Sequence, residues 1–457
     1  MNYDISKSKR LSEGVLIATA GIPALLFYFL LSTTAFNLPV YDDYSLLNFV
    51  NNFSQLNGLA SKFIYIINFQ HNEYKLVFVN AVFAVQYTLF GYIDFSVLSM
   101  IGSAFVIILY ILLAIIFKNP ANTNVFRVLW FLPISLLLFQ LQYASTLNFS
   151  MAGLQNISVL AFSLASIALL ANNSHSRFAG ACIALLFSIC ASGNGFLLLP
   201  VGGLLLIERK RWLHILIWIF LGLSIALVYF NNYSINHSVG HDDSEKLIKL
   251  ISQFNLIYIL AFIGSSIAKY QNHIPSVAFG IFLLSIWLVA VKNKYSTKNP
   301  AVFYYFIFLM FTAVAVSTIR SGLGVEQSLS SRYRIYSNLI LILTYIFLIE
   351  SYFEQIKNKK IQYTLICLSI LFSAIFFVMS NSAGYRFLKG RQQAITYEME
   401  FWKTGALNKN VQNSHQLNSN FDPAVNRQLE LGIYKPVTSV LLESIRLGVY
   451  KPPEYSK

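Results

Sequence analysis

Residues 96–117 read SVLSMIGSAFVIILYILLAIIF, a run without a single charged side chain. At the ~1.5 Å rise per residue of an α-helix, this run is long enough to cross the ~30 Å hydrocarbon core of a bilayer. Similar runs recur along the 457-residue chain, in which 56% of the residues are hydrophobic and only 11% are charged. Soluble domains carry roughly 25% charged residues. The sequence therefore predicts an all-α polytopic membrane protein.

Basic residues form clusters that separate the apolar runs, near residues 7–10, 118–127, 177, 209–211, 292–298 and 357–360. The net charge is +14, from 33 Lys and Arg against 19 Asp and Glu. Because cytoplasmic loops are enriched in Lys and Arg, these clusters indicate topology rather than nucleic-acid binding. They predict about eleven transmembrane helices, with the N-terminus inside and the C-terminus outside. The expected spans are 14–36, 96–117, 126–143, 155–171, 178–193, 195–207, 212–230, 276–291, 300–319, 335–352 and 361–380.

Two apolar runs, 75–92 and 251–270, do not fit this alternation, because counting either as a span would place a basic loop outside. We expect both to lie in the outer interface of the membrane or to form re-entrant segments. The span 195–207 is short and follows the helix breaker Ser192-Gly193-Asn194-Gly195. Such a broken region requires protein or a water-filled cavity to cover its backbone.

The first outer segment, 37–95, carries the acidic motif PVYDDY at 39–44 and the sequence QHNE at 70–73. Ionisable groups at a membrane boundary are costly to bury, so they usually have a function. We expect Asp42, Asp43 and Glu73 to be catalytic candidates. One of the two aspartates would deprotonate a hydroxyl group, and we favour Asp42 as this base.

His71, in the same outer segment, is a candidate substrate-binding residue. Asp42, His71 and Glu73 could instead have purely structural roles. Asp42 could cap the helix that begins near Ser45, since Asp is a favoured N-cap residue. The start of an interfacial helix would likewise explain His71 and Glu73.

A later outer loop, residues 320–334, reads RSGLGVEQSLSSRYR and breaks the expected charge pattern with three arginines. Arginine is suited to bidentate phosphate binding, and the N-terminus of the helix after Ser331 also favours an anion. We therefore expect Arg320, Arg332 and Arg334 to bind a phosphate group, with Arg332 as the best single candidate. The alternative is that the arginines snorkel to lipid headgroups.

Amide side chains, including Gln155 and Asn194, lie near the outer ends of the third to fifth spans; the others are Gln140, Gln142, Asn148 and Asn156. Amides beside a cavity suit hydroxyl-rich ligands such as sugars, although hydrogen bonding between helices explains each one equally well. A second group, His237, His241, Asp242 and Asp243, lies among Asn, Ser and Gly residues that favour a solvated loop. We expect no metal ion and no other cofactor.

The tail 381–457 is polar and contains a duplication, LGIYKP at 431–436 and LGVYKP at 447–452. Each copy follows a helical pattern that ends at Gly, with Pro a few residues later. The pattern predicts helices near 385–404, 423–431 and 437–447. We expect a transmembrane domain over 1–380 and a small outer helical tail, which either closes over a site or packs as an appendage.

An acidic motif after the first span, a long first outer loop with interfacial helices and a short outer tail resemble the GT-C superfamily of membrane glycosyltransferases. The closer resemblance is to the bacterial inner-membrane members that decorate O-antigen, the serotype-converting glucosyltransferases. The elements that carry it are PVYDDYSL at 39–46, QHNE at 70–73, SGNG at 192–195 and SRY at 331–333. Where related sequences have His-Arg, this chain has Tyr74-Lys75. It also lacks the Trp-Trp-Asp motif of oligosaccharyltransferases, which argues against protein N-glycosylation.

The resemblance implies a polyprenyl-phosphate-linked sugar donor, with undecaprenyl-phosphate-glucose or a related hexose as the expectation. Arg320, Arg332 and Arg334 would hold the phosphate leaving group, with Tyr333 beside them. Asp42 or Asp43 would deprotonate a hydroxyl of an O-antigen acceptor on the periplasmic face. A single displacement of this kind inverts the anomeric configuration.

Two other classes of function fit a multi-spanning chain. A transporter or flippase for lipid-linked sugars would place charges along a path through the membrane, usually between two repeated halves. The sequence shows no such repeat. An O-antigen polymerase or ligase uses a large late outer loop, whereas the acidic motif of this chain lies in the first outer loop.

Overall fold

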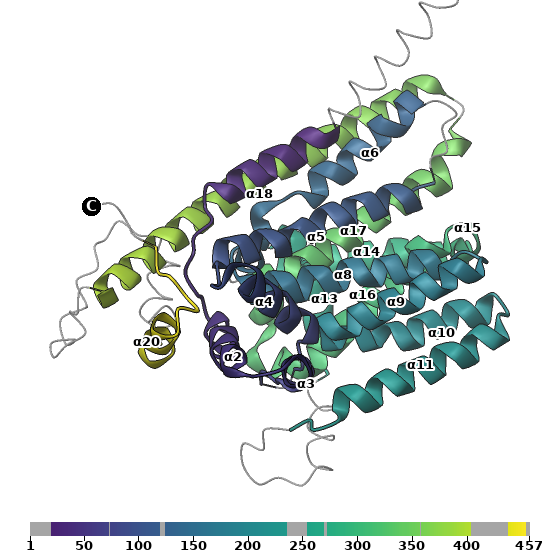
Figure 1. Cartoon of the computed structure of the whole chain (residues 1–457). Helices are drawn as coiled ribbons and strands as arrows, with labels where there is room; N and C mark the ends of the chain where they lie inside the picture. Colours follow the sequence, from purple (N-terminus) through teal and green to yellow (C-terminus); the bar gives the residue numbers. More distant parts are fainter. Residues whose placement is uncertain are drawn as a thin grey trace, which may run out of the picture.

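The computed structural model of the chain describes residues 20–72, 74–118, 124–234, 254–268, 272–356, 358–403 and 437–453. Helices account for 83% of these residues, and no β-strand occurs among them. Helix α18 (Lys359–Lys403) lies along one side of the helical bundle and α11 (Trp212–Phe230) along the opposite side (Figure 1). The expected all-α fold is confirmed.

Eight helical segments of the described chain are long and apolar enough to cross a membrane. Each overlaps one expected span, so the chain is a polytopic helical membrane protein. The helices that form these segments are α5 (Phe95–Ile116), α6 (Asn124–Leu138) with the short turns after it, α8 (Ser150–Leu170), α11, α14 (Ile274–Lys292), α16 (Pro300–Arg320), α17 (Ser331–Tyr352) and α18.

The three other expected spans fall on shorter helices. Residues 14–36 include the helix Ala20–Ser32, and residues 178–193 and 195–207 coincide with α9 (His175–Ala191) and α10 (Leu198–Glu208). The 3-10 turn η2 (Gly193–Leu197) separates α9 from α10 at the expected helix breaker. The expected total of eleven crossings therefore depends on these three shorter helices.

The two runs outside the alternation form α4 (Val77–Phe90) and α13 (Leu256–Ile263). With eight residues, α13 is about 12 Å long at ~1.5 Å per residue, which is too short to cross a bilayer. It packs so closely on α14 that a Cβ on Gly264 would lie 1.9 Å from the carbonyl oxygen of Ser276. Protein therefore covers this backbone, as a re-entrant segment requires.

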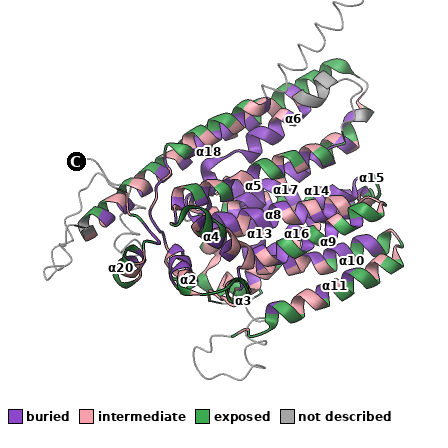
Figure 2. Cartoon of the chain, viewed as in Figure 1, coloured by how far each residue is buried: buried purple, intermediate pink, exposed green. Residues whose placement is uncertain are grey.

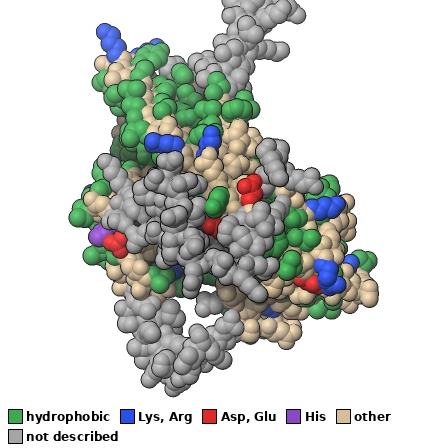
Figure 3. Space-filling view, turned by 90° about the vertical axis from the view of Figure 1, so that its left-hand side faces the viewer, with side chains coloured by type: hydrophobic (Ala, Val, Ile, Leu, Met, Phe, Trp, Pro, Cys, Tyr) green, Lys and Arg blue, Asp and Glu red, His purple; other side chains and the backbone are tan. Residues whose placement is uncertain are grey.

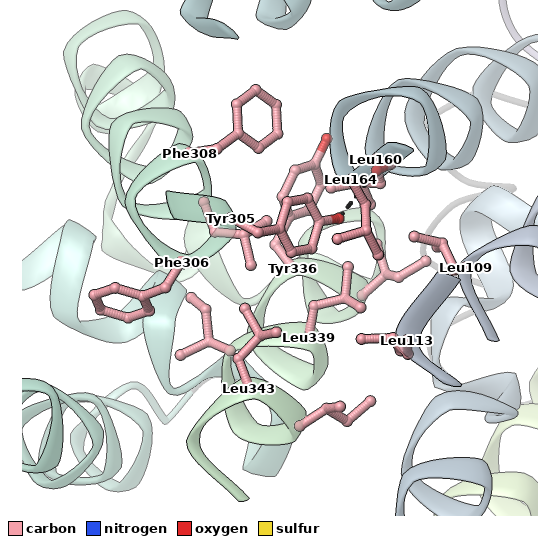
Figure 4. Packing of buried hydrophobic residues seen from close by; sticks show 14 of the residues in the cluster. Leu109, Leu113, Leu160, Leu164, Tyr305, Phe306, Phe308, Tyr336, Leu339 and Leu343 are labelled. Carbon is pink, nitrogen blue, oxygen red and sulfur yellow. Dashed lines mark hydrogen bonds between the residues drawn. The ribbon is translucent and has the colours of Figure 1, made fainter. Parts of the chain in front are cut away.

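The main hydrophobic core lies where α5, α8, α16 and α17 meet (Figure 4). Leucines of α5 and α8 face Tyr305 of α16 and Tyr336 of α17. The buried Tyr305 hydroxyl donates a hydrogen bond to the Leu160 carbonyl at 3.1 Å, so the ring packs without leaving an unpaired hydroxyl. In contrast, apolar side chains of α11 and α18 are largely exposed along their outer faces (Figure 2), as expected of lipid-facing helices.

One end of the bundle, here called the basic end, gathers loops that carry the basic clusters. Its centre is Glu350, which is 1% exposed. The Lys118 backbone N–H donates to this carboxylate at 2.7 Å, the Tyr295 hydroxyl at 2.6 Å and the Asn299 amide at 3.0 Å. The Lys298 ammonium contacts the Glu350 carbonyl. The loops after α5, α14 and α17 therefore meet at one end, as the charge pattern predicts.

The opposite end, here called the motif end, carries the acidic motif and has a second hydrophobic core. This core combines α2 (Asp43–Gln55), α4, the last turns of α18 and α20 (Thr438–Arg446). Ile93 N–H donates to the Val449 carbonyl at 2.8 Å, and the Tyr450 hydroxyl donates to the Asn37 carbonyl at 2.8 Å. Helix α20 and the residues just after it thus dock on α2 and its neighbours (Figure 1).

The tail is not separated from the last span by a loop, because α18 continues through residue 380 without interruption. Its 45 residues extend over about 68 Å at ~1.5 Å per residue, roughly twice the ~30 Å of a bilayer core. The expected helix at 437–447 is α20. The expected helix at 423–431 and the first copy of the duplication lie outside the described residues.

Candidate functional site

The two aspartates of the acidic motif occupy different environments. Asp43 is 1% exposed, and its carboxylate accepts hydrogen bonds from Met151 N–H at 3.0 Å and Val40 N–H at 3.2 Å. Met151 lies in the first turn of α8, so Asp43 holds the acidic motif against a helix N-terminus. Burial raises the pKa of Asp43 to about 7, although these backbone hydrogen bonds oppose the shift.

Asp42 is the accessible member of the pair, with 48% of its side chain exposed. It occupies the N-cap position of α2, but its side chain makes no capping hydrogen bond. The alternative role of Asp42, capping the helix with its side chain, is therefore not seen in this structure. Its carboxylate is available at the surface of the motif end.

His71 lies beside the Asp42 carboxylate. Its Nε2 is 3.4 Å from Asp42 Oδ1, and its Nδ1 is 2.8 Å from the Ser45 hydroxyl, which fixes the plane of the ring. The hydrogen bond with His71 lowers the pKa of Asp42, and the positive charges of Arg332 and Arg320 act in the same direction. Asp42 is thus held as a carboxylate in a positively charged environment.

A tight turn after α3 (Leu59–Asn68) places His71. His71 and Tyr74 exchange both backbone hydrogen bonds at 2.9 Å, and Asn72 adopts a left-handed φ of 49° between them. Glu73, the third carboxylate of the sequence prediction, lies outside the described residues.

Two flanking residues tie this turn to the end of α11. The Gln70 side chain accepts from Ser234 N–H at 3.0 Å, and buried Lys75 contacts the Asn231 carbonyl. The Lys75 backbone N–H also donates to the Tyr229 hydroxyl at 3.1 Å. In the segment 70–75, Gln70 and Lys75 are therefore structural clamps, whereas His71 and Tyr74 face the candidate site.

The three predicted arginines do not share one role in this structure. Arg320 ends α16 and hydrogen-bonds to Tyr74, and exposed Arg332 lies in the first turn of α17. Both act electrostatically on Asp42 and on the buried Tyr333. Arg334 instead donates from Nε to the Leu329 carbonyl at 3.3 Å, just before its own helix. The convergent cations are thus Arg320 and Arg332.

Four of the six predicted amides divide into two groups, and Asn156 bonds within its own helix to the Ala152 carbonyl at 3.0 Å. Gln155 approaches the Ser192 hydroxyl at 3.5 Å, and Asn194 approaches the Tyr336 hydroxyl at 3.5 Å. These contacts surround the η2 turn, where a Cβ on Gly193 would lie 3.7 Å from the Tyr74 ring, so the turn borders the candidate site.

Gln140 belongs to the second group and lies in a buried network between helices. Asn338 donates to Gln140 at 3.2 Å, and the Ser380 hydroxyl donates to it at 2.9 Å. Gln142 contacts the same oxygen. For this pair of glutamines, the interhelical alternative is the one that the contacts support.

Among the described residues, no group of three or more His, Cys, Asp and Glu side chains could hold a metal ion. The predicted loop residues His237, His241, Asp242 and Asp243 lie outside the described part of the chain. Figure 3 looks onto the motif end, where acidic, basic and histidine side chains reach the surface between apolar patches.

Comparison with protein-family models, with curated proteins and with solved structures finds no significant match to this chain. The candidate site therefore depends on its own geometry: a carboxylate, a histidine and two arginines at one end of an apolar helical bundle. Sequence reasoning missed Ser45 and the site-facing role of Tyr74.

Proposed function

We propose that this protein is a membrane glycosyltransferase that moves a hexose from a polyprenyl-phosphate donor to a hydroxyl group of a surface glycan. The observation that carries the proposal is the pairing of His71 with the Asp42 carboxylate at 3.4 Å, in the electrostatic field of Arg332 and Arg320. Such a site combines a group that accepts a proton with cations that bind a phosphate. The apolar helices around it suit a donor whose hydrocarbon tail stays in the bilayer.

In the proposed reaction, an acceptor hydroxyl attacks the anomeric carbon of the donor, and Asp42 takes its proton. The bond between that carbon and the phosphate oxygen breaks, and the polyprenyl phosphate leaves with the bonding electrons. Arg332 and Arg320 stabilise the phosphate as its negative charge grows. Attack opposite the leaving group inverts the configuration, as in inverting glycoside hydrolysis. In this proposal His71 orients Asp42, and Asn194 and Gln155 bind sugar hydroxyls.

The resemblance suggests undecaprenyl-phosphate-glucose as donor and O-antigen as acceptor, at the periplasmic face of a bacterial inner membrane. The gathering of the basic loops at the opposite end supports this orientation. A transporter or flippase is a weaker candidate, because the charges of the site lie at one end of the bundle rather than along its middle.

The deciding experiment uses the full-length protein in lipid nanodiscs, with synthetic polyprenyl-phosphate-glucose as donor and purified O-antigen as acceptor. We expect mass spectrometry to detect acceptor enlarged by one hexose, with release of polyprenyl phosphate. Asp42→Asn should abolish both products, whereas exposed Lys389→Met, in α18, should not. Full activity of Asp42→Asn, or loss of donor from one leaflet without product, would overturn the proposal.

A further inference from the structure

The backbone of the acidic motif needs support from outside the motif. Tyr41 has a left-handed φ of 51°, a conformation that costs a residue with a Cβ roughly 1 kcal/mol or more. The next residue, Asp42, starts α2 without a capping bond from its own side chain. The direction of the Asp42 carboxylate therefore depends on the contacts made by its neighbours Tyr41, Asp43 and Tyr44.

Those neighbours are held from two directions. On one side is the start of α8, where Met151 N–H bonds to Asp43 and the Phe149 ring lies 5.6 Å from the Tyr41 ring. On the other side is the C-terminal part of the chain. The Tyr44 hydroxyl is hydrogen-bonded to the backbone of Val437, just before α20.

Arg391 of α18 makes the central contact from the C-terminal side. It is 1% exposed, and its guanidinium lies 5.1 Å from the centre of the Tyr41 ring. Its charge also acts on the buried Asp43 carboxylate. A buried cation is costly unless its surroundings compensate it, and here the face of the Tyr41 ring lies against the guanidinium. Arg391 thus joins the two residues that flank Asp42.

Helix α18 is rigidly placed for this contact. Arg391 lies roughly 48 Å from Lys359 at ~1.5 Å per residue, beyond the ~30 Å of a bilayer core. The neighbouring Gln392 side chain donates to the Ala35 carbonyl at 3.1 Å, and Leu388 and Ile395 are buried. The last turns of α18 therefore form part of the wall behind the acidic motif.

We propose that Arg391 is a positioning residue, which acts through Tyr41 and Asp43 to aim the Asp42 carboxylate at the site. This inference rests on the proposed function, because Asp42 is the base of that reaction. Arg391 is buried behind the motif and therefore does not touch the donor. Its loss should lower the rate of the chemical step and leave donor binding by Arg320 and Arg332 intact.

The test compares Arg391→Lys and Arg391→Met with the control Lys389→Met, an exposed position of the same helix. We expect kcat to fall by about 10- to 100-fold in Arg391→Met, as for a small misplacement of a reacting group, with little change in the KM for donor. Arg391→Lys, which keeps the charge but loses the planar stacking, should recover part of that loss.

A second variant, Tyr41→Leu, distinguishes a positioning effect of Arg391 from a general loss of folding. Tyr41→Leu removes the ring that Arg391 lies over, so its effect on kcat should not add fully to that of Arg391→Met. Unchanged kcat in folded Arg391→Met, with Asp42→Asn inactive, would overturn the positioning role and leave the proposed function standing. Activity in Asp42→Asn would instead remove the proposed function itself. Full additivity of the double variant would also contradict the positioning role.

Discussion

His71 Nε2 lies 3.4 Å from Asp42 Oδ1, although α2 and α3 separate the two residues along the chain. The contact exists because the turn after α3 is clamped to the end of α11, which directs His71 back toward the start of α2. It distinguishes Asp42 from its neighbour Asp43, whose carboxylate is directed into the protein.

Asp42→Asn and Asp43→Asn should fail in different ways. Asp42→Asn removes a half-exposed base, so we expect activity to be lost while the melting temperature in nanodiscs stays unchanged. Asn at position 43 has only one side-chain acceptor for the backbone N–H groups of Val40 and Met151. The resulting unpaired buried donor should destabilise the fold by about 1–3 kcal/mol. Equal melting temperatures for the two variants would contradict this division.

His71→Asn should change the pH dependence of activity. The pKa of Asp42 is lowered chiefly by its hydrogen bond with His71, so the carboxylate persists to lower pH than an ordinary aspartate. Without His71 the pKa rises, and the acidic limb of the pH–rate profile should move to higher pH. Ser45→Ala is the comparison variant, because it keeps the imidazole and removes only the contact that fixes its plane, so it should move the limb less. An unmoved acidic limb in His71→Asn would count against the pairing.

Arg332→Gln should weaken donor use far more than Arg334→Gln. Arg332 is exposed and its charge acts on Asp42, whereas Arg334 donates to the Leu329 carbonyl. Loss of a charge-assisted hydrogen bond to phosphate costs about 1.5–3 kcal/mol, equivalent to about 10- to 150-fold in kcat/KM. Steady-state kinetics with varied donor would measure this difference. A larger loss in Arg334→Gln would reverse the assignment of the two arginines.

Glu350→Gln should affect stability without affecting the site. The Glu350 carboxylate accepts hydrogen bonds from the Lys118 backbone, Tyr295 and Asn299 at the basic end. Gln has one acceptor oxygen, so part of this network is lost, at about 1–3 kcal/mol. We expect a lower melting temperature and unchanged kcat per folded molecule. A change in kcat at constant stability would mean that the basic end is coupled to the site.

Cysteine labelling can test the orientation of the bundle. Lys292→Cys lies at the basic end and Leu323→Cys at the motif end, and both native side chains are exposed. In a background without Cys182, Cys190 and Cys367, a membrane-impermeant maleimide should label only Leu323→Cys in spheroplasts. Lys292→Cys should react only after permeabilisation. The opposite pattern would place the site on the cytoplasmic face.

The sequence by itself determined the helical class and the positions of the long spans. Both are local properties, since an uncharged run such as 96–117 has few stable conformations in a bilayer other than a helix. The clustering of basic residues also predicted correctly which loops meet at one end. Eleven crossings remain a prediction, because α9, α10 and the first helix are shorter than the other spans.

Only the tertiary structure decided the environments of adjacent residues. Asp42 and Asp43 have the same side chain, yet only Asp43 reaches the backbone of α8, far away in the sequence. Likewise, Arg334 donates to the nearby Leu329 carbonyl, while Arg332, two residues earlier, is exposed and acts on Asp42 through its charge. Side chains one or two positions apart on a helix point in different directions, and which direction is buried depends on distant segments. The packing of α8, α11 and α18 around the motif is therefore what assigns these residues their separate environments.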